Sequence, residues 1–357
     1  RHHAVDASVI ALMQATVAQV LVERNDLKHE QALRRQAPQW KEYEGADEGT
    51  RFQFRQWKRR MHSLLRILNQ ALDEDRIVVM SNLRLRLGNS QVHEAQIGKL
   101  AAKKVGDAFS VVEIDRASSE ALWCALTRDP DYDPKEGLPE NPERTLRVHG
   151  THLSANDEVH IFPVAAAAIA IRGGYAELGA SFHHARIYRI NGKKPSYGMV
   201  RVYSVDLQKF RQQDLFSVEL KPQTVSMRYA DPKVRKAIAE GNAEYLGWLV
   251  PDDELLLDAS SFTGQVAEAQ TILGPIKRWR LDGLFGPSQL RLRPLQLAAE
   301  GLASDSEDYL KKTLDMPGWR PVVNKLLSVG RVTVVRRDAL GRPRLESVAN
   351  LPVTKSF

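Results

Sequence analysis

Residues 1–24 read RHHAVDASVIALMQATVAQVLVER, an apolar stretch that opens on two histidines and one aspartate. Its apolar residues recur with helical spacing, so we expect one helix over 4–24 that continues, more polar, to residue 35. His3 and Asp6 are three positions apart and share a face of that helix. A carboxylate beside an imidazole suits metal-dependent phosphodiester cleavage, since the carboxylate binds Mg²⁺ and the imidazole accepts a proton. The alternative is a helix cap, because the helix dipole stabilises an aspartate at a helix start.

A second helix is expected over 52–73, because apolar residues recur on one face. Short strands then predominate, and Asn191-Gly192 between two of them predicts a hairpin. The expected strands are 77–80, 111–114, 160–163, 180–190, 199–206, 254–258, 279–281, 290–293, 331–336 and 344–347, with a turn at 338–341 and a short helix at 305–313. His183 and His184 fall inside a strand, so we expect them on opposite faces and not as a metal pair.

Composition bounds the class of protein. The chain has 357 residues, which favours two or three domains, and its single cysteine, Cys124, excludes an internal disulfide and a cysteine-based zinc site. The start at Arg1 without a methionine is expected of a fragment. No stretch predicts a signal peptide or a membrane span, so no membrane partner is expected.

Positive charge is concentrated at one end of the chain. The formal net charge is +7, and residues 277–357 hold 15 Lys and Arg against 8 Asp and Glu, so the whole excess lies there. A basic terminal region favours a polyanionic partner, nucleic acid first. The alternative is a basic surface that only contacts solvent.

The motif His2-His3-Ala4-Val5-Asp6-Ala7 at the head of an apolar helix resembles the third RuvC motif of the type II CRISPR effectors, the Cas-nine family, and its small II-C-like members above all. Looser similarities follow in the family's order at 81–97, 186–206, 247–262, 279–294 and 319–337. The resemblance implies an α+β fold, in which the C-terminal segment of an RNase H-like (RuvC) domain is followed by two β-rich domains. The implied boundaries are 1–79 for the RuvC part, 80–219 for a wedge domain and 220–357 for a PAM-interacting domain. This last domain reads the PAM, the short duplex motif beside the target.

The resemblance implies a Mg²⁺-dependent DNA endonuclease, with Mn²⁺ able to substitute, from the bacterial cytoplasm. Asp6 and His3 are its implied catalytic and metal-site residues, Asp6 as ligand and His3 as general base, for cutting the non-target strand. The implied partners are guide RNA (crRNA and tracrRNA), target double-stranded DNA, and the N-terminal, recognition-lobe and HNH segments of the same protein. Because the other metal ligands belong to those missing segments, this chain alone should not cut DNA.

The resemblance also implies DNA-reading residues near the C-terminus. Arg320 matches a PAM-reading position, and Ser288, Gln289 and Arg291 match a second one. A guanidinium can bond guanine O6 and N7 together, and a glutamine can do the same with adenine. Trp319 is expected to hold the stem of Arg320 by stacking. The expected phosphate contacts are Arg84, Arg86, Arg331, Arg336 and Arg337.

Two other interpretations stay open at this point. The chain could be a non-catalytic, basic nucleic-acid-binding protein with a β-barrel-like C-terminus. It could also be an unrelated metal hydrolase that uses His2, His3 and Asp6, although the sequence offers no further His/Asp cluster with metal-ligand spacing.

Overall fold

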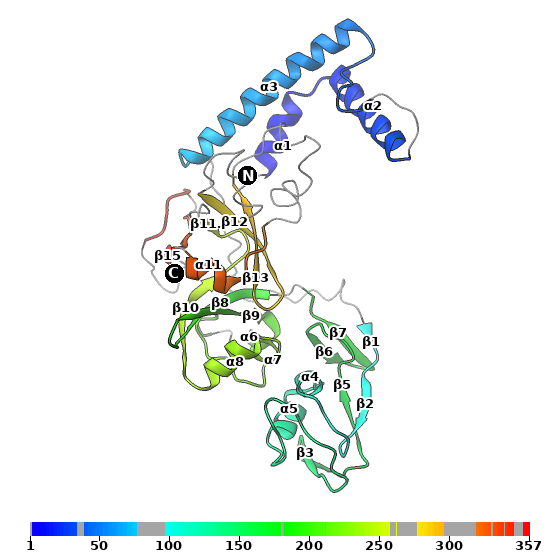
Figure 1. Cartoon of the computed structure of the whole chain (residues 1–357), viewed down its shortest axis with the longest axis vertical. Helices are drawn as coiled ribbons and strands as arrows, with labels where there is room; N and C mark the ends of the chain where they lie inside the picture. The colour runs from blue at the N-terminus through cyan, green and yellow to red at the C-terminus, as the bar shows by residue number, and fades with distance from the viewer. Residues whose placement is uncertain are drawn as a thin grey trace.

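A computed structural model describes residues 2–33, 39–76, 97–179, 182–210, 212–257, 262, 277–295, 319–329, 331–338, 340–345 and 353–357, with the backbone alone for 2–5. Figure 1 shows a helical part at one end, a small module of short strands and helices at the other, and a β-rich body between them. The mixture of helices and strands, with the β-rich parts following the helices, confirms the expected α+β class. Within the described ranges, no helix is both long and apolar enough to cross a bilayer.

The helical part consists of α1 (His2–Ala11), α2 (Ala15–Ala32) and α3 (Glu48–Asp73). The expected single helix over 4–24 is wrong, because the chain leaves helical geometry after Ala11 and is extended at Gln14. The break lets α2 lie against α3, where Val17 and Val20 are buried on Phe54.

The second expected helix is confirmed as α3. Its apolar stripe faces inward, with Phe54, Leu68 and Leu72 buried. Asp47 caps the helix by accepting the Thr50 backbone N–H at 2.9 Å, which satisfies one of the free donors of the first turn.

The small module spans residues 97–179. Its elements are β1 (Ile97–Gly98), β2 (Ala101–Lys104), α4 (Val111–Asp115), α5 (Glu120–Thr127), β3 (Leu146–Val148), β4 (Thr151–Leu153), β5 (Glu158–Ile161), β6 (Ala168–Ile171) and β7 (Gly174–Glu177). They pair antiparallel as β1-β7-β6, β2-β5 and β3-β4. The expected strand at 160–163 overlaps β5, whereas the expected strand at 111–114 is wrong.

Residues 111–114 are helical because of a capping box. The Ser110 side chain accepts the Glu113 N–H, and the Glu113 carboxylate accepts the Ser110 N–H in return. Two free donors are satisfied together, and this local arrangement starts a helix in spite of the β-branched residues Val111 and Val112.

A three-stranded sheet, β10-β8-β9, forms the next part of the body. Its elements are β8 (Phe182–Ile190), β9 (Ser196–Tyr203), α6 (Ser204–Leu207), the 3₁₀ helix η1 (Gln208–Phe210), α7 (Val225–Arg228), α8 (Pro232–Ala239) and β10 (Ala243–Leu249). The hairpin at Asn191-Gly192 is confirmed, with Ile190 opposite Ser196. The expected boundary between residues 219 and 220 lies between β9 and β10, two strands of the same sheet.

The last part is a five-stranded sheet in the order β13-β12-β11-β14-β15. Its elements are β11 (Glu254–Leu256), β12 (Arg278–Phe285), β13 (Gln289–Pro294), α11 (Val323–Val329), β14 (Thr333–Val335) and β15 (Lys355–Ser356). The turn at 338–341 is confirmed by the Gly341 N–H, which donates to the Asp338 carbonyl at 3.0 Å. Arg344 and Leu345 lie outside any strand, and the elements predicted at 77–80, 305–313 and 346–347 lie outside the described residues.

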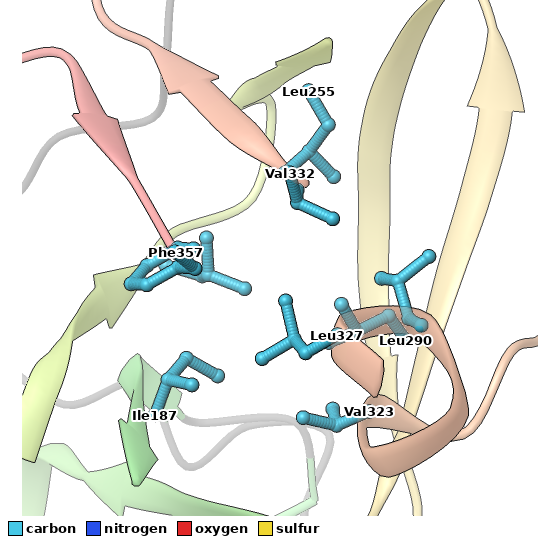
Figure 2. Close-up of a pocket in the computed structure, with 9 residues that line it drawn as sticks. Ile187, Leu255, Leu290, Val323, Leu327, Val332 and Phe357 are labelled. Carbon is cyan, nitrogen blue, oxygen red and sulfur yellow. The ribbon is translucent and has the colours of Figure 1, made fainter. Parts of the chain in front are cut away.

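One hydrophobic core joins the two sheets. Ile187 of β8 meets Leu255 of β11, Leu290 of β13 and Val323 of α11 around a small cavity that Phe357 also lines, as Figure 2 shows. The cavity has a volume of about 10 Å³ and an apolar lining, so a water molecule would gain no hydrogen bonds from the side chains there. The shared core fixes the C-terminal sheet on the β8–β10 sheet.

The expectation that His183 and His184 of β8 point to opposite faces of the sheet is wrong. The register shifts between Phe182 and His184, which marks a bulge, and the two Nδ1 atoms lie 2.8 Å apart in the interior. His184 Nε2 accepts from Arg186 Nε at 3.1 Å, so the His184 proton is on Nδ1 and is donated to His183. Burial, with the nearby Arg186 charge, holds the pKa of His184 well below 6.5.

Stability should therefore fall in mild acid. Below about pH 6.5, His184 binds a proton in the unfolded chain but stays neutral in the folded chain. The contribution of neutral His184 to the free energy of unfolding is therefore fully present above pH 6.5 and is lost as the pH falls. We expect a loss of up to about 1.4 kcal/mol for each pH unit below that point. Thermal unfolding at pH 7.5 and 5.5 measures the effect, and His184→Asn should reduce it. The exposed His152 is the control, and an equal reduction in His152→Asn would contradict the assignment.

Candidate nucleic-acid interface

One face of β12 and β13 carries three arginines around one aspartate. Asp282 Oδ1 accepts a hydrogen bond from Arg280 Nη2 at 2.7 Å. Its Oδ2 lies 2.7 Å from Arg291 Nε and 3.1 Å from Arg293 Nη2. At the edge of the cluster, Asp252 Oδ1 lies 3.7 Å from Arg280 Nη1. Three positive and two negative charges leave this face positive, within the most basic part of the chain.

Arg320 lies beside that face. Residues 319–322 run antiparallel to β13, with Trp319 bridged to Leu292 and Val322 bridged to Gln289. The exposed Arg320 guanidinium lies 4.1 Å from the centre of the Phe285 ring, which is 45% exposed at the end of β12. Cation and ring form a cation–π contact that restricts the arginine.

The expectation that Trp319 holds Arg320 is wrong. The Trp319 ring packs into the core, 4.9 Å from the Phe262 ring and 5.1 Å from the Trp279 ring between centroids. The stacking partner is Phe285, which is distant in sequence and reaches Arg320 only through the pairing of β12, β13 and residues 319–322. Sequence reasoning missed it for that reason.

The second expected reading position is next to the first. Gln289 is half-buried and lies opposite Phe285 in the sheet register, so it neighbours the ring that carries Arg320. The Ser288 carbonyl accepts the Val323 N–H at 2.9 Å. Sheet pairing thus brings Gln289, Arg291 and Arg320 onto adjacent segments.

Arg336 and Arg337 are not placed for the phosphate contacts expected of them. They are 2% and 6% exposed. Arg336 Nη2 lies 3.0 Å from the carboxylate of Asp253, and its guanidinium stacks 3.7 Å from the Trp248 ring centre. Arg337 Nε donates to Glu254 Oε2 at 3.1 Å. Both carboxylates are fully buried, so these arginines compensate charge inside the fold, whereas Arg331 is exposed.

A four-charge cluster joins the end of α3 to the C-terminal sheet. Arg278 and Arg337 each place Nε on Glu254, at 2.8 and 3.1 Å, and Nη2 3.1 Å from Asp75 Oδ1. Arg278 also donates to the Leu72 carbonyl. Two arginines and two carboxylates balance, and the pairing connects the helical part to the sheet that carries Arg291.

The remaining predicted residues lie at the N-terminus or outside the described ranges. Asp6 is exposed on α1, and the backbone of His3 lies one turn earlier in the same helix. Asp6 can offer one carboxylate to a metal ion, but in the described ranges no three His, Cys, Asp or Glu side chains gather closely enough to hold one. Arg84 and Arg86 lie outside the described residues.

Comparison with known proteins relates each part of the chain to a domain of one kind of protein. Consecutive segments match protein-family models for RuvC endonuclease subdomain 3 (residues 1–86), the CRISPR-associated endonuclease Cas9 β-hairpin domain (90–180), the topo homology domain of Cas9 (182–251) and the Cas9 C-terminal domain (252–357). The chain belongs to the Cas9 family. This confirms the resemblance to the Cas-nine effectors that the opening motif indicated. The matched domains also show that the chain corresponds to the C-terminal region of such a protein.

Individual Cas9 proteins agree over nearly the whole chain. It is 59% identical to Cas9 of Corynebacterium diphtheriae and 46% identical to Cas9 of Actinomyces naeslundii, in each case over 99% of this chain. The chain spans about a third (33%) of the length of these relatives. The crystal structure of the C. diphtheriae protein in complex with sgRNA and target DNA matches with a TM-score of 0.76, covering 99% of this chain and 40% of that one. The A. naeslundii type II-C enzyme matches at 0.75, covering 99% and 37%.

Proposed function

We propose that this Cas9-family chain forms the DNA-reading and RuvC-completing part of a CRISPR RNA-guided DNA endonuclease. The observation that carries the proposal is the positive face of β12 and β13 next to Arg320, inside the segment that matches the Cas9 C-terminal domain. The proposed partners are a guide RNA and a target duplex. The relative from C. diphtheriae, similar over 99% of this chain, was solved with sgRNA and target DNA.

The proposed reading chemistry uses the major groove. Stacking on Phe285 holds the Arg320 guanidinium at an exposed position, where it can donate to guanine O6 and N7 together. Gln289, opposite Phe285, has the amide that pairs with adenine. Arg331, exposed beside β14, is kept as a phosphate contact, which positions the duplex without reading it.

The proposed nuclease role rests on α1. Two Mg²⁺ ions, when bound, would polarise the scissile phosphate and activate water, and Asp6 would hold one of them. His3, one turn before Asp6, would accept the proton of the attacking water. The helical part exposes large apolar side chains, which supports packing of further RuvC segments against it: Ile10, Val22, Leu33, Phe52 and Ile67.

Arg320→Ala tests the reading role in the full-length protein with its guide RNA. A bidentate base contact contributes about 1–3 kcal/mol of discrimination, so the variant should bind its target more weakly and lose preference at one PAM position. A randomised-PAM depletion assay measures the profile.

Arg331→Ala is the matched control for that assay. A phosphate contact should weaken all PAM sequences alike and lower the salt slope of binding by about one unit. An unchanged PAM profile in Arg320→Ala would instead assign reading to another side chain, with Arg291 and Gln289 next to test.

A further inference from the structure

Asp282 occupies a bulge in β12. The register passes from Leu281 opposite Leu292 to Gly283 opposite Arg291, so Asp282 has no cross-strand partner. Asp282 is two positions from Arg280, so strand alternation puts both side chains on one face, and the bulge places Gly283 opposite Arg291. Here the carboxylate meets Arg280 and Arg293, which oppose each other directly across the two strands. Like charges in that position repel, and Asp282 compensates them.

The same bulge determines where Arg291 lies. Gly283 stands opposite Arg291, and a Cβ at Gly283 would come within 3.5 Å of Arg291 Nη2. The guanidinium therefore lies across the glycine, with Nε 2.7 Å from Asp282 Oδ2. At this distance the two groups form an ion pair, so Asp282 compensates the charge of Arg291 and restricts its guanidinium.

We propose that Asp282 is a positioning residue that determines DNA specificity. It holds Arg291 in the orientation that reads a base, and it limits the attraction that three clustered arginines would otherwise exert on any phosphate. The inference rests on the proposed function, in which this face meets duplex DNA.

Asp282→Asn in the full-length protein with guide RNA separates this role from a structural one, because its two effects have opposite signs. Discrimination at the PAM position read by Arg291 should fall about tenfold, since a misplaced guanidinium loses its bidentate contact. Affinity for a duplex without a PAM should rise, with a salt slope larger by about one unit, since one compensating charge is gone. A variant that only destabilised the fold would lower both.

Asp252→Asn is the matched control, because it removes the same charge at the edge of the cluster, where Asp252 lies 3.7 Å from Arg280. It should raise the salt slope without altering the PAM profile. Asp282→Glu keeps the negative charge, so its binding should have the same salt slope as that of the unmodified protein. The thermal unfolding midpoint checks that each variant is folded.

Three results decide the matter. Loss of preference at the same PAM position in Asp282→Asn and Arg291→Ala, but not in Asp252→Asn, supports the proposal. Identical PAM profiles for Asp282→Asn and Asp252→Asn would overturn it, as would an unaltered profile in Arg291→Ala. In those two cases the proposed function survives as long as the unmodified protein prefers a PAM, whereas PAM-independent binding by the unmodified protein would reject both.

Discussion

Replacing Asp6 with alanine in the full-length protein should reduce cleavage of the displaced, non-target strand to background, while the HNH domain still cuts the target strand. Asp6 is exposed on α1, in the segment that matches RuvC subdomain 3, and its carboxylate is the proposed metal ligand. A two-metal site that loses a carboxylate loses charge balance as well as geometry. Strand-specific labelling of a duplex substrate at millimolar Mg²⁺ measures both cuts.

Asp26→Ala provides the control for Asp6→Ala, because Asp26 is also an exposed aspartate on the helical part, in α2. Both cuts should persist in that variant. Non-target cleavage that continues unchanged in Asp6→Ala would reject the catalytic assignment and favour a non-catalytic nucleic-acid-binding role for this segment.

Replacing Arg336 with alanine should lower the free energy of unfolding by about 3–5 kcal/mol, the range for removing one partner of a buried ion pair. The guanidinium contacts the fully buried Asp253, donates to the carbonyls of Trp248 and Val353, and stacks on the Trp248 ring. Denaturant unfolding of the chain measures the change.

Arg331→Ala is the matched arginine for this comparison. It is exposed and donates a hydrogen bond of 3.3 Å to Ser356 Oγ, so its removal should change stability by less than about 0.5 kcal/mol. If Arg336→Ala keeps full stability and weakens DNA binding at every PAM alike, Arg336 contacts phosphate after all.

The sequence carried enough local information to identify the opening motif and the hairpin at Asn191-Gly192. It could not place the break before α2, because no proline or glycine marks residues 12–14. That break depends on the packing of Val17 and Val20 against Phe54, which lies in a later helix.

The arginines show the same limit more sharply. Arg320 and Arg336 both stand beside apolar runs of a basic region, and the sequence alone suggested nucleic-acid contact for each. Their difference comes from distant partners: Arg336 meets a carboxylate 83 positions earlier, and Arg320 meets the ring of Phe285. The His183–His184 contact likewise depends on a bulge that strict strand alternation does not foresee.

The four-charge cluster at the end of α3 limits how this region can be recombined. A chimaera that exchanged only residues 252–357 for those of a relative would take Arg278, Arg337 and Glu254 away from Asp75, which belongs to the helical part. If the host lacked a carboxylate at that turn, two partly buried guanidinium groups would share a single counter-charge. Transfer of PAM preference between relatives should therefore succeed more often when the turn after α3, which contains Asp75, is exchanged together with the C-terminal sheet.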